Sequence, residues 1–189
     1  MRLFTFAAAL RRDSLNRKLV RLAATAAERA GVTVDLADFR EFDMPLYDGD
    51  LEASAGSPAG AQKLRERFLA ADAFLIASPE YNFSIPGTLK NALDWVSRTN
   101  PIAWRGKPGL LLSASPSLVG GNRGLWCVRV PLEATGAHVY PDMFSLAAAD
   151  KAFDAAGALV DPKMAARLDK TVAAFVATAR ALAKATAAG

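Results

Sequence analysis

Residues 9–16, ALRRDSLN, hold the side chains best suited to binding an anion. Arg11, Ser14 and Asn16 stand where a helix is predicted to begin, so free backbone N–H groups and the helix dipole favour a phosphate there. Guanidinium, hydroxyl and amide groups would complete such a cradle. The alternative is a helix cap, Ser14, followed by solvent-facing arginines. The sequence contains neither GxGxxG nor GxxxxGK[ST], so the usual dinucleotide and P-loop fingerprints are absent.

Residues 79–87, PEYNFSIPG, follow an apolar run and carry a proline near each end, which restricts φ twice within a short connection. Gly87 has no Cβ, so a neighbour or a ligand could approach it closely. The backbone N–H and C=O groups between the prolines could serve a flat heterocycle, with the ring of Tyr81 or Phe83 beside it. The alternative is a tight strand-to-helix connection in which these two rings fill the edge of the core.

A third stretch, SASPSLVGGNR at residues 113–123, combines small side chains with a glycine pair. Small residues at 113–115 would let the backbone come near a ring system. The Gly120-Gly121 pair permits a tight turn. The alternative is a flexible connection without a ligand.

Cys127 and His138 are the only cysteine and the only histidine. An intramolecular disulfide, a cysteine-based metal cage and a site of several histidines are therefore excluded. Catalysis through a histidine-paired nucleophile is disfavoured for the same reason. We expect Cys127 to be a small core residue of an apolar helix and His138 to be a structural residue of a short strand.

Composition places the chain among ordinary globular proteins. It has 189 residues, 52% hydrophobic and 22% charged, and we expect one domain over 1–189. The formal charge of +4 comes without a dense block of Lys and Arg, so no nucleic-acid partner is expected. No apolar run reaches the length of a membrane span. The segment MRLFTFAAALRRDS is interpreted as a first strand rather than a secretory signal, which favours the cytoplasm.

Apolar runs alternate with amphipathic stretches along the chain. Strands are predicted at RLFTFA, VTVDLAD, AFLIAS, PGLLLSA and AHVYP. Helices are predicted after Ser14, after Ser57-Pro58, after Pro86, over 122–135 and after Asp161-Pro162. This alternation predicts an α/β three-layer sandwich with a five-stranded parallel sheet. Residues 43–58 are a long excursion of the kind that is often functional, and residues 184–189 are expected to fray.

The three polar stretches follow the first, third and fourth predicted strands. In a parallel sheet of this kind, ligands bind at the carboxyl ends of the strands. We therefore expect residues 9–16, 79–87 and 113–123 to meet at one edge.

The chain resembles the NADPH-dependent FMN reductases, a family with a flavodoxin-like fold that includes chromate, quinone and azo-dye reductases. PEYNFSIPGTLKNALDWVSR is close to the family's most specific signature. LRRDSLNRKL and SASP…GGNR match its other two loops in order and position. The resemblance covers nearly the whole chain and implies the sheet order 2-1-3-4-5.

The resemblance also implies non-covalently bound FMN. Its phosphate would lie at the first stretch, the isoalloxazine would border the second, and the third would lie on the other side of the flavin. The residues implied to bind it are Arg11, Ser14, Leu15, Asn16, Pro79, Glu80, Tyr81, Asn82, Ser113, Ser115, Gly120 and Gly121. Arg123 is expected near the site or at a subunit interface.

Two departures from the family pattern concern flavin affinity. The family usually has Gly-Ser where this chain has Ala8 and Ala9, which removes one hydroxyl donor to phosphate. A charge-assisted hydrogen bond is worth about 1.5–3 kcal/mol, so affinity would fall about tenfold or more unless backbone N–H groups compensate. Ser117 stands where the family commonly has Gly, and a requirement for positive φ would strain it.

By the same resemblance, NADPH or NADH delivers hydride to FMN, and a quinone, flavin, azo compound or oxidised metal ion then takes the electrons in a ping-pong cycle. Glu80 is expected to position its loop or to serve a subunit contact rather than to act as a catalytic acid. Candidates for the 2′-phosphate of NADPH are Arg11, Arg12, Arg105 and Arg123. The competing hypotheses are a flavodoxin-like electron carrier and a non-enzymatic module that has lost flavin.

The family forms homodimers and homotetramers, so self-association is expected. Trp95 and Trp126 would lie either at subunit contacts or in the core. Residues 43–58 are candidates to cover a neighbouring subunit's site.

Overall fold

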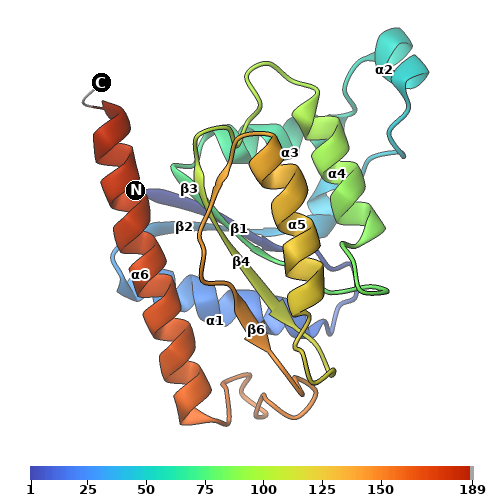
Figure 1. Cartoon of the computed structure of the whole chain (residues 1–189). Coiled ribbons are helices and arrows are strands. Elements are labelled where there is room, and N and C mark those ends of the chain that lie inside the picture. Colours follow the sequence, from blue (N-terminus) through green and yellow to red (C-terminus); the bar gives the residue numbers. More distant parts are fainter. Residues whose placement is uncertain (188–189) are drawn as a thin grey trace.

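The apolar runs form one sheet of parallel strands at the centre of the molecule (Figure 1). In this computed structural model, residues 1–187 are described. The strands are β1 (Arg2–Ala7), β2 (Thr33–Asp38), β3 (Ala73–Ala77), β4 (Pro108–Ala114), β5 (His138–Val139) and β6 (Phe144–Leu146). Their order is β2-β1-β3-β4-β5, which confirms the order 2-1-3-4-5.

The fifth position of the sheet is divided between two short strands, which the sequence did not predict. His138 pairs with Pro108 at the start of β4, and Phe144 pairs with Leu112 near its end. The register advances by two residues between these pairings. Pro141 lies in the interruption, and proline cannot donate a ladder hydrogen bond.

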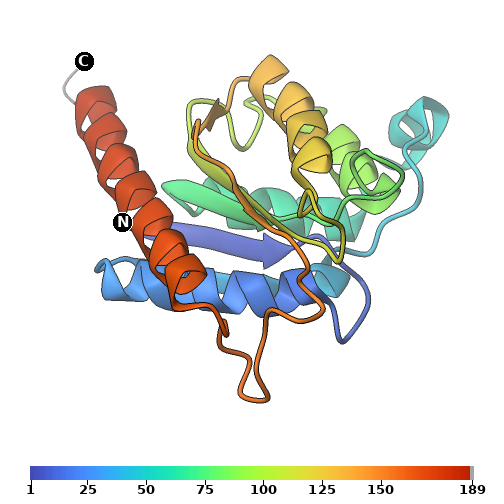
Figure 2. The ribbon, with the colours of Figure 1, turned by 60° about the horizontal axis from the view of Figure 1, so that its bottom comes forward.

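Helices cover both faces of the sheet (Figure 2). They are α1 (Leu15–Arg29), α2 (Gly49–Ala55), α3 (Ala59–Leu69), α4 (Gly87–Ser97), α5 (Asn122–Ala134) and α6 (Pro162–Ala187), with a short 3-10 helix η1 (Phe39–Phe42). The buried residues of α1 and α6 pack on one face, and those of α3, α4 and α5 pack on the other. The five predicted helices are confirmed, whereas α2 and η1 were not predicted.

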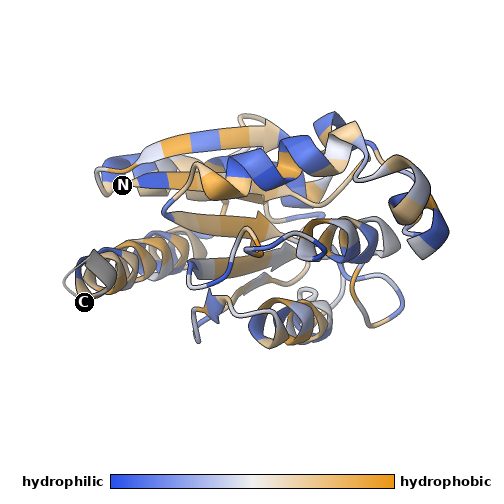
Figure 3. Cartoon of the chain, turned by 90° about the horizontal axis from the view of Figure 1, so that it is seen from above, coloured by the Kyte–Doolittle hydropathy of each residue, from blue (hydrophilic) through white to orange (hydrophobic). Residues whose placement is uncertain are grey.

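The strands β3 and β4 are buried along their whole length, as expected of central parallel strands. The strands at the centre of Figure 3 are correspondingly coloured as mostly hydrophobic. On the α3 side the core is aromatic: Phe4, Phe6 and Phe68 are fully buried and contact one another. On the α1 side it is mostly aliphatic. This rigid body holds the loops at the carboxyl ends of the strands.

Residues 43–58 include α2, which buries no side chain and projects from the body (Figure 1). The excursion is attached at its base to α4. Trp95 Nε1 donates to Pro45 O at 2.8 Å, and the Asn91 amide bonds both Pro45 O and Tyr47 N. Trp95 is therefore a core residue rather than a subunit contact.

The last helix, α6, is described through Ala187. Of the segment 184–189 that was expected to fray, residues 184–187 are helical, and residues 188–189 lie outside the described part. Within residues 1–187, no helix has both the length and the apolar character required to cross a membrane.

Candidate functional site

Three loops follow β1, β3 and β4 and lie at the same edge of the sheet, because these strands are parallel neighbours. We call them the first loop (8–14), the second loop (79–86) and the third loop (115–121). The side chain of Asn16 joins the first to the third: its Nδ2 donates to Ala114 O and its Oδ1 accepts from Ala114 N, both at 2.9 Å. The amide that was expected to contact phosphate thus holds two loops together.

The first loop presents a row of free donors. Within the described chain, no group accepts a hydrogen bond from the backbone N–H of residues 10–13. Ser14 caps α1, with its Oγ accepting from Asn16 N at 3.2 Å, so the hydroxyl proton remains available. Arg11 and Arg12 are exposed on the same loop. Free N–H groups, a hydroxyl and guanidinium groups before a helix make an anion cradle.

Ala8 and Ala9, where the family pattern has Gly-Ser, are both buried, at 1% and 3% exposure. Ala8 N donates to Ala77 O at 2.9 Å, so this part of the loop continues the pairing of β1 with β3. The hydroxyl that this chain lacks would therefore belong to the start of the first loop. The free N–H groups belong to residues 10–13, which come later in the same loop.

The second loop is a two-residue hairpin. Tyr81 and Ser84 exchange backbone hydrogen bonds of 3.1 and 3.0 Å. Asn82 and Phe83 between them have φ of 51° and 63°, the left-handed pattern of a type I′ turn. Tyr81 and Phe83 are 55% and 63% exposed, so the alternative in which they fill the edge of the core is wrong. The turn is rigid and presents two rings outward.

No other part of the described chain approaches Gly87 closely, whereas the expected approach of a ligand stays a prediction. Gly87 is the first residue of α4, its φ is not positive, and a Cβ built there would meet nothing within 4 Å. The chain itself therefore does not require glycine at this position. The connection to α4 is set instead by Pro86, which is buried and caps the helix.

Glu80 joins the second loop to α5. Its Oε2 accepts from Gly124 N at 2.9 Å, and Arg123 Nε lies 3.6 Å from Oε1. Arg123 also lies over the Phe83 ring, 3.9 Å from its centroid. A carboxylate at the first turn of a helix caps free N–H groups and complements the dipole. Glu80 therefore positions the loop, and only the backbone of residue 80 remains for a ligand.

The glycine pair of the third loop is fixed by packing rather than flexible. Gly120 and Gly121 have φ of 61° and 82°. A Cβ at residue 120 would lie 2.7 Å from the backbone of Leu146, and one at residue 121 would lie 2.0 Å from Ser113 Oγ. Ser113 itself is fully buried, and its hydroxyl has no hydrogen-bond partner in the described chain.

Ser115 and Ser117 form a small hydroxyl cluster on the same loop. Ser117 N donates to Ser115 Oγ at 3.2 Å, and the two hydroxyl oxygens lie 3.1 Å apart. The residues with positive φ that are not glycine are Asn82, Phe83 and Ala148 within the described chain. Ser117 is not among them, so the strain considered for this substitution does not arise.

The single cysteine lies on α5 against the second loop, whereas the single histidine lies away from the three loops. Cys127 is half-buried rather than a core residue, and its Sγ lies 3.7 Å from Phe83 O. His138 pairs with the first residue of β4, at the opposite edge of the sheet from the loops. His138 is exposed there.

Two residues of the site were missed from the sequence. Arg40 Nε donates to Leu10 O at 2.7 Å and so holds the first loop from outside. Gly124 leaves room for Glu80, since a Cβ built at residue 124 would lie 3.0 Å from the Cβ of Glu80. No motif marks either residue, since each acts on a partner at least 30 residues away in the chain.

Together the loops can hold an elongated ligand that has an anionic end and a flat end. The anion cradle lies on the first loop. The rigid turn of the second loop and the small side chains of the third lie beside it. Such an edge suits a phosphorylated ring system.

Comparisons with known proteins show the family of the chain. The family model described as NADPH-dependent FMN reductase matches residues 1–151. A probable NADPH:quinone oxidoreductase 2 of Oryza sativa subsp. japonica is 38% identical over 169 residues, which is 87% of this chain and 81% of the relative. An NAD(P)H-dependent FMN reductase of Pseudomonas aeruginosa is 40% identical over 135 residues, 70% of this chain and 71% of the relative.

Solved structures show the same architecture. FerB, a flavoenzyme NAD(P)H:(acceptor) oxidoreductase from Paracoccus denitrificans, superposes with a TM-score of 0.80 at 31% identity, covering 95% of this chain and 97% of that one. A flavodoxin from the domain Archaea gives a TM-score of 0.62 at 10% identity, covering 95% and 99%, and shows likeness of fold alone.

Proposed function

The chain belongs to the NADPH-dependent FMN reductase family, and on this premise we propose that it binds FMN and passes hydride from NADPH or NADH to a small-molecule acceptor. The observation that carries the proposal is the row of unpaired N–H groups at residues 10–13, flanked by Arg11 and Ser14 and adjoining the rigid turn of the second loop. A flavin mononucleotide has the phosphate and the flat ring that these features fit.

Each loop has its own task in this proposal. The first loop binds the phosphate through backbone N–H groups, with Arg11 and the hydroxyl of Ser14 adding charge-assisted hydrogen bonds. The backbone of Pro79, Glu80 and Asn82 borders the isoalloxazine. The third loop, through Ser115, closes the other side. Leu15, Asn16, Ser113, Gly120 and Gly121 support these contacts from behind, since each is used in packing or in a cap.

When bound, FMN supplies the redox chemistry, accepting hydride from the nicotinamide and releasing it to the acceptor. The protein's part is to bind and orient the ligands. The described site offers no histidine, and Glu80 is engaged with Gly124. The proposed chemistry therefore depends on positioning and requires no protein side chain as general acid.

We propose a quinone as the first acceptor class to test, because the relatives in rice and in Paracoccus carry acceptor-reducing names. Free flavin, azo compounds and oxidised metal ions are the other classes. If donor and acceptor use the same exposed face in turn, the kinetics are ping-pong, and double-reciprocal plots at several acceptor concentrations will be parallel.

The test is the visible spectrum of the purified protein before and after addition of FMN. We expect flavin bands that NADPH bleaches under anaerobic conditions and that a quinone restores. A protein that takes up no FMN would exclude the proposal. FMN uptake without oxidation of NADPH or NADH would support the alternative, a flavodoxin-like electron carrier.

We also propose that the protein acts in the cytoplasm and self-associates. The outer face of α5 carries Trp126 and Val130, which are 57% and 67% exposed, and exposed Phe83 lies close by through Arg123 and Cys127. Large apolar side chains gathered on one face are typical of a protein interface. A dimer or a tetramer would cover them.

A further inference from the structure

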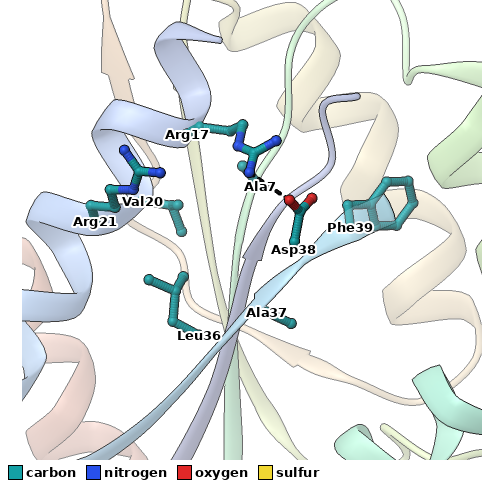
Figure 4. A pocket seen from close by; sticks show the side chains of 8 residues that line it. All are labelled: Ala7, Arg17, Val20, Arg21, Leu36, Ala37, Asp38 and Phe39. Carbon is teal, nitrogen blue, oxygen red and sulfur yellow. Dashed lines mark hydrogen bonds and ion pairs between the residues drawn. The ribbon is translucent and has the colours of Figure 1, made fainter. Parts of the chain in front are cut away.

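A small cavity lies between α1 and the carboxyl end of β2, and nothing in the proposed FMN site uses it (Figure 4). Its volume is about 170 Å³. We call it the β2 notch. It is lined by Ala7, Arg17, Val20, Arg21, Leu36, Ala37, Asp38 and Phe39.

The notch has an apolar floor and a charged mouth. Leu36 lies on the face of β2 that α1 covers incompletely, and it remains 45% exposed beside buried Val20. Arg17 and Arg21 are four residues apart on α1, so both side chains leave the same face of the helix (Figure 4). A ligand entering the notch would meet two guanidinium groups above an apolar surface.

The charges in the notch are not balanced. Arg17 pairs with Asp38 at 2.6 Å, and the other oxygen of Asp38 accepts from Arg40 N at 3.1 Å. Both oxygens of the acid are thus occupied. Arg21 makes no ion pair or hydrogen bond with any described residue. The notch therefore carries one uncompensated positive charge at its mouth.

The size and position of the β2 notch limit the kinds of ligand that it can bind. Pockets that enclose a whole ligand commonly measure about 300–1,000 Å³, so the β2 notch fits one end of a larger molecule. It lies next to the first loop, at the end of the strand where dinucleotide-binding sheets read the 2′ position of the adenosine ribose. In those sheets an acid accepts from the 2′-hydroxyl, whereas an arginine takes the 2′-phosphate.

The span to the flavin loops suits a dinucleotide. In the order β2-β1-β3-β4, the second loop follows a strand two positions from β2, and the third loop follows one three positions away. At about 4.8 Å for each spacing, these loops lie on the order of 10–14 Å from the notch along the sheet edge. Exposed Arg12 of the first loop lies between them, is not used for the FMN phosphate, and would meet the diphosphate.

We propose that the β2 notch binds the 2′-phosphate of NADPH, with Arg21 as the ion-pairing residue, Arg17 held in place by Asp38, and Leu36 against the ribose. The inference rests on the proposed function, since it names how that site distinguishes its two cosubstrates. It replaces the earlier candidates Arg105 and Arg123, because Arg105 precedes β4 at the opposite edge and Arg123 is engaged with Glu80 and Phe83.

The kinetic test is the substitution Arg21→Gln. We expect KM for NADPH to rise about tenfold or more, because a charge-assisted contact is lost. We expect KM for NADH and both kcat values to stay within about twofold, because NADH lacks the phosphate. The matched control is Arg105→Gln, another exposed arginine, which should change neither KM. Equal effects on NADPH and NADH, or an unchanged ratio between them, would overturn the proposal.

A binding measurement separates this inference from the proposed function. Calorimetric titration of the purified protein with adenosine 2′,5′-bisphosphate and with adenosine 5′-monophosphate requires no turnover. We expect the bisphosphate to bind more tightly to the wild type and the difference to disappear in Arg21→Gln. No difference in the wild type would refute the notch as a 2′-phosphate site. Failure of FMN uptake would refute the proposed function but would not contradict the β2 notch as a 2′-phosphate site.

Discussion

Asn16 shows how a side chain beside a ligand site can act through the backbone of another loop. Its amide bonds both the N–H and the C=O of Ala114, 98 residues away, and it is 3% exposed. Removing a partner from a buried backbone group costs about 1–3 kcal/mol for each group left unpaired. The phosphate end and the ring end of the proposed FMN site are thus held in register by one side chain.

The substitution Asn16→Ala is expected to lower the free energy of unfolding by about 2–6 kcal/mol, since two buried groups lose their partner. Asn16→Asp should recover only the acceptor for Ala114 N and leave Ala114 O facing a carboxylate. Urea denaturation of the three proteins measures the series. Equal stability of wild type and Asn16→Ala would show that the two bonds contribute nothing.

Ala9→Ser tests whether the departure from the family pattern weakens flavin binding. We expect the Kd for FMN to change by less than about tenfold, which corresponds to less than about 1.4 kcal/mol, because the free N–H groups of residues 10–13 supply the donors. Quenching of FMN fluorescence on binding measures the Kd. Arg11→Gln is the comparison, with an expected loss of about tenfold or more. A larger gain in Ala9→Ser would show an impaired loop.

At the scale of elements, the connections after the strands are fixed by close approach. Gly121 faces Ser113, and Glu80 caps α5 over Gly124, so the second loop, the third loop and α5 form one packed unit. At the loop edge of the sheet, the unit presents the hairpin turn and the hydroxyl cluster of Ser115 and Ser117. The contacts that shape this edge are made within the chain itself.

Gly121→Ala is expected to be much more destabilising than Gly157→Ala. Both glycines have positive φ, 82° and 84°, so each substitution carries a backbone cost of about 1–2 kcal/mol. A Cβ at residue 157 meets nothing within 4 Å, whereas one at 121 lies 2.0 Å from Ser113 Oγ, which adds about 1–3 kcal/mol of overpacking. Thermal or urea unfolding of both variants checks the difference, and equal losses would contradict the packing argument.

Asp38 links η1 to α1 and makes the free energy of unfolding depend on pH in the acid range. Burial alone would raise the pKa of its carboxyl, but the hydrogen bond from Arg40 N and the ion pair with Arg17 outweigh it, and the pKa lies below its ordinary value of 3.8. The native state therefore keeps the charge to lower pH than the unfolded chain does. Its contribution is complete above pH 3.8 and is lost as pH falls through the native pKa.

The matching experiment compares wild type with Asp38→Asn across acid pH. We expect the wild type to have the larger free energy of unfolding from neutral pH down to the acid range. The difference in free energy of unfolding between the two proteins should disappear as pH falls below 3.8, because the protonated acid then resembles the amide. A gap that does not depend on pH would show that the charge of Asp38 is not what stabilises η1.

At the scale of the whole molecule, the order β2-β1-β3-β4-β5 decides which loops become neighbours. The first, second and third loops meet because β1, β3 and β4 adjoin, although the last residue of β1 lies 70 positions before that of β3 and 107 before that of β4. The same order places the β2 notch beside the first loop. Outside these sites, Trp126 and Val130 of α5 are exposed apolar side chains on one helix.

Replacing both Trp126 and Val130 by Glu is expected to break self-association, because four like charges would face one another across a symmetric interface. Sedimentation velocity should show the wild type as a dimer or tetramer and the double variant as a smaller species. Val160→Glu, at another valine that is 60% exposed, is the control and should leave the mass unchanged. A wild type that sediments as a monomer would refute the proposed interface.

The sequence by itself determined the main helices and strands and the edge of the sheet at which the loops after the strands lie. Apolar runs predicted β1 to β5, helical spacing predicted five of the helices, and parallel strands require that their carboxyl ends share one edge. Residues 9–16 and 79–87 could be recognised because cap and turn chemistry is local. The interruption between β5 and β6 escaped prediction, although Pro141 marks it.

Only the tertiary structure decided what the individual side chains do. Asn16 bonds Ala114, Glu80 caps α5, and Arg21 lines the β2 notch without a partner among residues 1–187. The physical reason is that each partner comes from a segment distant in sequence, brought near by the packing of α1 and α5 on the sheet. Local periodicity predicts which face of a helix or strand a residue occupies. It does not predict which group from another segment the residue contacts.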